Sequence, residues 1–341
     1  QMPAADAKVS CRLRPNADAK AIDLVLSVSG GAIIQGATVT AEVIFGAADS
    51  IFITADQPSE SLTGTLRLEK DISADLKIAA IIGYPNAEWF QCHELTVRLP
   101  KFAMYVPVKE FPSPPSGIVT ARINERVNRL VMWAQSCFNG YSPGEDKPTT
   151  FAARFVSLRD GAQVMIETTA ANGGELHVRS DSMEIAGEII ADLGQYLGLT
   201  ELATTCDFPE EFAKFQDVIT KVDEYNAVRM KLTGEMADSA QLVKALVIKA
   251  EDARILDDMP QMKRMYGSLY EVNRELMGEF MKRSNNYTEL LAVLKEVNVM
   301  IQKASKFRIG QPKTTLVTEC RNAIKSNQMQ TLPNIIRTGT P

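Results

Sequence analysis

The chain has 341 residues, 45% of them hydrophobic and 23% charged, with a net charge of −5. This composition is typical of globular proteins, and the length predicts about two or three domains rather than one core. The longest apolar runs, such as residues 78–83, are far shorter than a membrane span, and no secretory signal stands at the start. Because Met2 follows Gln1, we expect the chain to be a fragment of a larger protein.

Cysteine usage indicates a reducing compartment. The five cysteines are Cys11, Cys92, Cys137, Cys206 and Cys320, which are widely spaced and form no CxxC pair. An odd count without paired spacing argues against a disulfide framework and against a zinc site. We therefore expect a cytoplasmic protein.

Residues 1–106 are expected to form a β-sandwich domain. Alternating and β-branched residues predict strands at 8–13, 22–28, 37–45, 50–54, 62–68, 76–82 and 95–99. Turn residues such as Gly30-Gly31 separate them at short intervals. This spacing predicts an antiparallel, immunoglobulin-like sandwich. The Cys–Trp–Cys core pattern is missing from the sequence, so the prediction concerns the architecture alone.

A proline-rich segment, 107–117, begins the second expected domain, which is an α/β platform over residues 107–208. We predict a strand at 118–123, followed by a helix that Asn124 caps and that ends at Cys137. Three strands are then expected at 151–158, 163–168 and 175–179. A second helix is expected from Ser182 to Leu197, with Gly198 ending it. Asp160-Gly161 and 172–174 are expected to be hairpin turns. This order indicates an antiparallel sheet with two helices on one face.

Beyond Phe208-Pro209 the apolar residues recur at helical spacing, which predicts a helical hairpin over 209–309 that turns at Pro260. Short terminal helices are expected at 314–326 and 329–336, within residues 310–341. The narrow apolar seam would be buried between the two arms. The seam is expected to contain Val218, Val222, Tyr225, Leu232, Met236, Val243, Leu246, Met262, Leu269, Leu276, Leu290, Leu294, Val297 and Ile301. The same pattern includes Ala250, Ala253, Met265, Val272, Phe280 and Tyr287. Two further seam positions are occupied by the polar residues Arg229 and Ser239.

The two parts of the chain differ in charge. Residues 1–208 hold 17 Lys+Arg and 25 Asp+Glu, whereas residues 209–341 hold 20 and 17. Near the end, one acidic residue, Glu319, accompanies a basic series. This series could be a solvated helix face, or it could contact acidic partners or a lipid surface. Its members are Lys303, Lys306, Arg308, Lys313, Arg321, Lys325 and Arg337.

We find no pattern that indicates catalysis, a metal or a cofactor. The two histidines, His93 and His177, lie on predicted strands, and Cys92 beside His93 would point to the opposite strand face. Glu251-Asp252 and Asp257-Asp258 lie on or beside a polar helical face, where carboxylates stay ionised. Phosphate-binding and nucleophile-elbow motifs are missing from the sequence, and too few aromatics accompany the basic residues to favour nucleic acid.

Methionines of the helical region, such as Met230, Met259 and Met277, could line a peptide groove, although packing in the seam is the commoner role. Most of the seam is expected to be paired within the hairpin. Contacts with other proteins are therefore expected on the charged flanks, at the tip and at the basic end after Lys303.

Several longer segments resemble one known family. Residues 98–105, 221–225, 250–254, 285–291 and 320–327 are similar, in order, to the C-terminal part of the Bardet–Biedl syndrome 2 family of BBSome subunits. The resemblance runs from about residue 8 to 339. Long collinear matches are more specific than a short motif. The resemblance implies an ear domain like that of γ-adaptin, an appendage-like platform, a hairpin and terminal helices, without the family's β-propeller and coiled coil.

The resemblance further implies a non-catalytic scaffold of a coat complex that carries membrane proteins to and from cilia. The implied partners are other BBSome subunits, especially the Bardet–Biedl syndrome 7 and 9 proteins, and ciliary membrane cargo. The implied locations are the cytoplasm, cilium, ciliary basal body and, peripherally, the ciliary membrane. An alternative is an appendage-like module that binds cargo tails or acidic phospholipid through the basic end.

Overall fold

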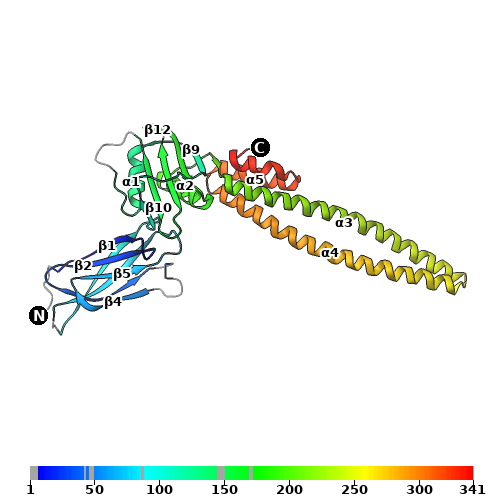
Figure 1. The fold of residues 1–341 in the computed structure, drawn as a ribbon, viewed down its shortest axis with the longest axis horizontal. Coiled ribbons are helices and arrows are strands. Elements are labelled where there is room, and N and C mark those ends of the chain that lie inside the picture. Colours follow the sequence, from blue (N-terminus) through cyan, green and yellow to red (C-terminus); the bar gives the residue numbers. More distant parts are fainter. Residues whose placement is uncertain are drawn as a thin grey trace. The chain divides into compact units, whose positions relative to one another are not determined.

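The computed structural model divides into two compact units, Gln1–Phe208 and Pro209–Pro341 (Figure 1). The first unit consists of β-sheets with two helices, and the second is helical. The structure describes residues 7–41, 44–45, 50–85, 88–143, 150–168 and 172–340.

The first unit begins with an antiparallel β-sandwich, as predicted. One sheet has the strand order β1-β2-β5 and the other β4-β3-β6-β7. Alternate residues of the inner strands, such as Leu24 and Leu26 in β2, are fully buried between the sheets. The strands are β1 (Val9–Asn16), β2 (Ala21–Val28), β3 (Ile33–Thr40), β4 (Ser50–Ser59), β5 (Ser61–Leu66), β6 (Ala74–Gly83) and β7 (Gln91–Leu99).

The strand predicted at 37–45 differs from the structure. It begins earlier, at Ile33, and ends at Thr40, while residues 42–43 lie outside the described part of the chain. The pairing register of β3 shifts between Ile34 and Gly36 on both sides of the strand. This irregularity interrupts the period-two alternation that a sequence pattern relies on, so the first half of the strand was missed.

The platform domain is a six-stranded antiparallel sheet of order β13-β9-β12-β11-β10-β8. Helices α1 and α2 lie together on one face: the indole Nε1 of Trp133 donates to Asp192 Oδ2 at 2.9 Å, and each helix packs on a strand. The elements are β8 (Tyr105–Pro107), β9 (Ile118–Arg126), α1 (Val127–Cys137), β10 (Ala152–Ser157), β11 (Gln163–Thr168), β12 (Asn172–Ser180), α2 (Met183–Leu197) and β13 (Thr204–Asp207).

Two local predictions in the platform were wrong. Asn124 does not cap α1, because it lies within β9 and the helix begins at Val127. The turn predicted at 172–174 is part of β12, where the register shifts; residues 169–171 lie outside the described residues. Gly161 and Gly198 have positive φ and form the expected turn and helix end.

The second unit is an antiparallel hairpin of two long helices with a terminal bundle. It comprises α3 (Pro209–Ile255), α4 (Met259–Ser305), α5 (Gln311–Lys325), the 3-10 turn η1 (Met329–Thr331) and α6 (Leu332–Thr338). Each arm has 47 residues. At about 1.5 Å per residue, each arm is about 70 Å long, and Figure 1 shows that most of this length extends beyond α5.

The hairpin turns before Pro260, not at it. The chain reverses at Leu256–Asp258, and Asp258 Oδ1 accepts a hydrogen bond from the Gln261 N–H at 3.1 Å as the cap of α4. Pro260 lies in the first turn of α4. The first helical N–H groups lack a partner within the helix, so a proline there costs no hydrogen bond.

Candidate functional site

A heptad seam joins the two arms of the hairpin. On α4 it runs at spacings of three and four from Met262 to Ala304, and on α3 from Phe215 to Ala253. Among the residues predicted for it, Val222, Leu232, Leu290, Val297 and Ile301 are buried. The others are half-buried, namely Val218, Tyr225, Met236, Val243, Leu246, Met262, Leu269, Leu276 and Leu294.

Two aromatic residues assigned to the seam are outside it. Phe280 is 61% exposed and Tyr287 54% exposed. The unbroken spacing from Leu276 places Glu279 and Asn286 in the seam instead, and further along it places Val293 and Met300 there rather than Leu294 and Ile301. The prediction failed because it followed hydrophobic side chains where the heptad continues through polar ones.

The middle of the seam is polar. Glu279 Oε2 and Asn286 Oδ1 are buried and have no hydrogen-bond partner among the described residues. Arg283 lies between them and donates to Met236 Sδ at 3.6 Å. On α3, Arg229 is exposed at its seam position and Ser239 is half-buried. Buried polar atoms without partners weaken packing, so this stretch is expected to be less stable than the base of the hairpin.

The base of the hairpin is a well-packed helical bundle. Phe212 and Ile219 of α3 and Val297 of α4 are buried there. The terminal helices contribute Leu316, Cys320, Leu332, Ile335 and Ile336 to the buried residues. Polar contacts surround this core, including Lys303 Nζ to Glu211 Oε2 at 3.3 Å.

Arg308 is not part of a basic contact surface. Its side chain is 2% exposed and donates to the carbonyl oxygens of Ala304, Ile336 and Arg337. Arg337, predicted for the same surface, lies over the Phe212 ring at 4.7 Å from its centroid. Both cations therefore connect α4 and α3 to the terminal helix. Sequence could not separate them from solvated residues, because charge alone does not reveal burial.

Of the remaining basic residues in the predicted series, Lys303 is paired with Glu211 and Lys306 is half-buried. Lys313, Arg321 and Lys325 are exposed, all on α5. The basic series is thus divided between internal contacts and one helix surface.

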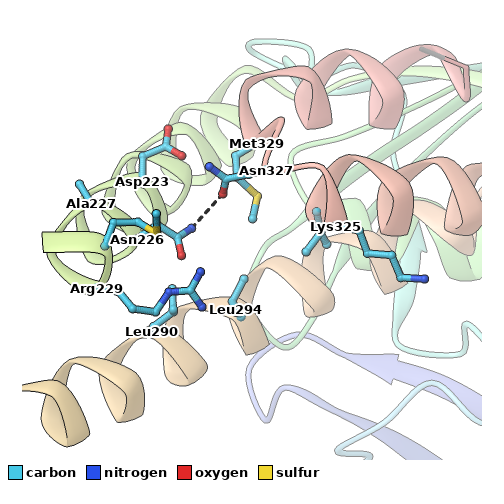
Figure 2. A pocket seen from close by; sticks show the side chains of 11 residues that line it. Asp223, Asn226, Ala227, Arg229, Leu290, Leu294, Lys325, Asn327 and Met329 are labelled. Atoms are coloured by element: carbon cyan, nitrogen blue, oxygen red, sulfur yellow. Dashed lines mark hydrogen bonds between the residues drawn. The ribbon is translucent and has the colours of Figure 1, made fainter. Parts of the chain in front are cut away.

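A groove opens where α5 and η1 meet the hairpin (Figure 2). Its volume is about 620 Å³. The apolar lining comes from Met230, Leu290, Leu294, Ile324 and Met329, and the polar lining includes Asp223, Asn226, Arg229, Lys325 and Asn327.

Hydrogen bonds hold the groove together. Asn226 Nδ2 donates to Asn327 Oδ1 at 3.1 Å, as the dashed line in Figure 2 marks. Gln330 Nε2 donates to Asp223 Oδ2 at 2.9 Å. The Asp223 carboxylate thus already has a hydrogen-bond donor in Gln330, whereas the side chains of Arg229 and Lys325 are exposed to solvent beside the apolar lining.

The outer surface of the hairpin is more apolar than the sequence analysis anticipated. At the tip, Ile255 and Leu256 are 78% and 79% exposed. Along α4, exposed apolar or aromatic side chains recur over more than six turns, at Tyr266, Tyr270, Met277, Phe280, Met281, Tyr287 and Leu291. The sequence predicts one seam with charged flanks, and these exposed side chains form a second apolar surface that this prediction does not contain.

Titratable side chains outside the groove were compared with the requirements of metal binding and catalysis. Within the described ranges, no group of three or more His, Cys, Asp or Glu side chains could hold a metal ion. The hydrogen bond from the Tyr266 hydroxyl lowers the pKa of Glu251, which is the opposite of what a catalytic acid needs. Burial raises the pKa of Cys137 to about 12, which suppresses its thiolate. None of the helices, as far as the structure describes them, is long and apolar enough to cross a bilayer.

Comparison with known families gives four matches in the order of the domains described above. They are a BBS2 GAE domain at residues 16–102, a BBS2 platform domain at 105–197, a BBS2 hairpin at 209–306 and a BBS2 C-terminal helix bundle at 311–337. The chain belongs to the BBS2 family. The resemblance and the fold class inferred from the sequence are thereby confirmed.

Curated relatives agree with this assignment. The mouse and human proteins named "BBSome complex member BBS2" are each 37% identical over 320 residues, which cover 93% of this chain and 44% of theirs. The Caenorhabditis elegans protein "BBSome complex member bbs-2" is 24% identical over 344 residues. The chain therefore spans less than half the length of the curated relatives that it matches.

Proposed function

We propose that this chain is a non-catalytic, structural part of the BBSome, the coat complex that carries membrane proteins to and from cilia. The observation that carries this proposal is the BBS2 hairpin itself: an arm of two 47-residue helices with exposed apolar residues along its length. The relatives are named as members of that complex. Exposed apolar side chains that recur along one face of an element are typical of protein interfaces.

The partners that we propose are other BBSome subunits, in particular the Bardet–Biedl syndrome 7 and 9 proteins, and through the complex, ciliary membrane cargo. The proposed locations are the cytoplasm, the cilium and its basal body, and the ciliary membrane as a peripheral protein. In this scheme the domains 1–106 and 107–208 act as rigid spacers. The hairpin, residues 209–309, and the terminal helices, 310–341, supply contacts with neighbouring subunits.

A pull-down of the purified chain against separately purified BBSome subunits tests the proposal. We expect at least one subunit to bind with a Kd of about 1 µM or tighter, as stable interfaces do. A matched chain without residues 209–341 is the control, and it is expected to lose that partner. The proposal is wrong if no subunit binds the intact chain at tens of micromolar.

The alternative, a lipid contact at the basic end, loses support from the burial of Arg308 and the position of Arg337 over Phe212. Only Lys313, Arg321 and Lys325 of the predicted series are exposed. About three surface cations contribute about 1 kcal/mol each at an anionic surface, which gives weak attachment. We therefore expect the chain not to float with phosphoinositide-containing liposomes at about 150 mM salt, near physiological ionic strength.

The flotation assay has a direct control in the double variant Arg321→Glu with Lys325→Glu. If the wild type floats and this variant does not, the basic helix α5 is a lipid-binding surface and our expectation is wrong. Liposomes of neutral lipid distinguish charge-driven binding from insertion of apolar residues.

A further inference from the structure

The second stripe of α4 has its own heptad pattern. Starting at Tyr266 and ending at Leu294, it recurs at alternating spacings of four and three and contains no charged residue. Its members are Tyr266, Tyr270, Asn273, Met277, Phe280, Ser284, Tyr287, Leu291 and Leu294. Such a pattern is typical of a helix face that packs against another helix. Here the other helix is not α3, because α3 occupies the seam.

The facing part of α3 leaves room beside this stripe. Each residue of the stripe comes one position after a seam residue of α4. In an antiparallel pair of helices, these residues lie on the same side as the residues that come one position after the seam residues of α3. The hydrogen bond from the Tyr266 hydroxyl to Glu251 Oε1 shows which side of α3 this is. In the middle of the arm that side carries the small side chains of Thr233, Ala237 and Ala240, all exposed. Large side chains on α4 beside small ones on α3 would leave a shallow channel between the two helices, which we call the channel.

The opposite side of the hairpin is different. There, the positions before the seam on α3 are mostly charged, and Val228, Leu242 and Ala245 stand among them. The charged residues are Lys221, Glu224, Lys231, Glu235, Asp238, Lys249 and Asp252. Lys231 and Glu235 form an ion pair on this side at 3.7 Å. Solvated charge of this kind needs no partner. The asymmetry therefore restricts docking to the side that carries the uncharged stripe.

Incomplete burial of the seam also indicates that another helix packs on this side of the arm. In the distal half of the arm, Met236, Val243, Leu269 and Leu276 are only half-buried, although they face the other helix. Two helices alone leave the edges of such a seam in contact with water. A third helix in the channel would cover these edges as well as the second stripe.

The channel leads into the groove at the base of the hairpin. Leu294 ends the stripe and lines the groove, where Arg229 and Lys325 are exposed and Asp223 already accepts a hydrogen bond from Gln330. An apolar channel with cations at one end is complementary to a helix that is apolar along one face and acidic at the corresponding end. A helix that covers Tyr266 to Leu294 would need about 29 residues.

We propose that the channel and groove together bind an amphipathic α-helix of another BBSome subunit, forming a three-helix coiled coil with the arm. The helix carries one uncharged heptad stripe along its length and a carboxylate at the end that lies beside Arg229 and Lys325. This proposal rests on the proposed function, because it assigns the occupant of the arm within the complex.

Substitutions on the two sides of the hairpin test the proposal. Met277→Glu with Phe280→Glu puts two charges on the stripe, at side chains that are 66% and 61% exposed. Val228→Glu with Leu242→Glu is the matched control on the charged side, where the side chains are 45% and 48% exposed. Because all four residues are exposed outside the seam, the variants are expected to fold, as circular dichroism and the thermal midpoint would show.

The affinity of each variant of the 341-residue chain for the subunit bound in the pull-down is then measured by biolayer interferometry. We expect the stripe variant to bind at least about tenfold more weakly, and the control within about twofold of wild type. Reversing Arg229 and Lys325 to Glu should weaken binding about fivefold at low salt and less at high salt, whereas Lys313→Glu with Arg321→Glu should not.

Photocross-linking identifies the occupant. With p-benzoylphenylalanine in place of Phe280, we expect cross-links to a single helical segment of the bound subunit, mapped by mass spectrometry. Cross-links to a second copy of this chain, or to a β-domain of the subunit, would overturn the proposal. If wild type and stripe variant bind equally, the proposal is overturned while the proposed function stands. If the wild-type chain binds none of the subunits, the proposed function itself falls.

Discussion

Replacing Val297 with aspartate is expected to destabilise the helical unit by at least about 3 kcal/mol, because a charged side chain would be buried without a partner. Val297 is fully buried in the base of the hairpin, as are Ile219 and Val222 of α3. Circular dichroism at 222 nm during urea denaturation measures the effect. Hydrogen exchange in 209–305 should rise in the same variant, while exchange in residues 7–41 should not.

Leu246→Asp is the matched comparison. From the sequence alone, Leu246 and Val297 are equivalent seam positions, and so is Leu294. In the structure Leu246 and Leu294 are only half-buried, and Leu294 lines the groove. An aspartate at either can remain hydrated, so we expect losses of about 1 kcal/mol. Equal losses at Val297 and Leu246 would contradict the view that the stability of the arm resides in its base.

Periodicity and proline placement predicted the order of domains well, since both act locally. The alternation in residues 22–28 gave β2, and helical spacing beyond Pro209 gave the two arms. Edge strands β8 and β13 were missed, because they have only three and four residues and are set by pairing with distant strands. Pairing of that kind is a tertiary effect that short sequence windows do not contain.

For the interaction surface, the sequence indicated the arm but not which of its faces is available. The spacing of three and four between apolar residues predicts that Phe280 and Tyr287 lie in the seam. The burial of Asn286 and of Glu279 Oε2, beside the exposure of Phe280 and Tyr287, shows that the polar residues take those positions and that the aromatics form a separate stripe. Patterns on one helix cannot show which of two stripes its neighbour covers.

Arg308 shows a different kind of wrong prediction. Its charge predicts an exposed contact residue, whereas in the structure it is buried and joins two helices. Its guanidinium donates to the carbonyl oxygens of Ala304 at 3.2 Å, Ile336 at 2.9 Å and Arg337 at 3.3 Å. These acceptors lie near the ends of α4 and α6, where helix carbonyls lack partners within the helix. The side chain therefore joins the last helix to the hairpin.

We expect Arg308→Met to destabilise the terminal bundle by about 3 kcal/mol, since methionine can fill part of the space but donates none of the three hydrogen bonds. The variant Arg308→Lys keeps the charge but lacks the rigid fork of donors that reaches all three acceptors, so an intermediate loss is expected. Hydrogen exchange in residues 329–339, which include η1 and α6, measures the effect directly.

Arg321→Met is the control for this experiment, because Arg321 is exposed on α5 and is expected to change protection in 329–339 very little. If Arg308→Met left that protection unchanged, the three hydrogen bonds would not be what holds the terminal helix in place. Because Lys325, Asn327 and Met329 line the groove beside this bundle, loosening it should also weaken binding of the partner helix. The hydrogen bonds of Arg308 stabilise the terminal bundle, and those three residues of that bundle line the groove together with Arg229. A loss of stability at Arg308 is therefore expected to lower the affinity for the partner helix as well.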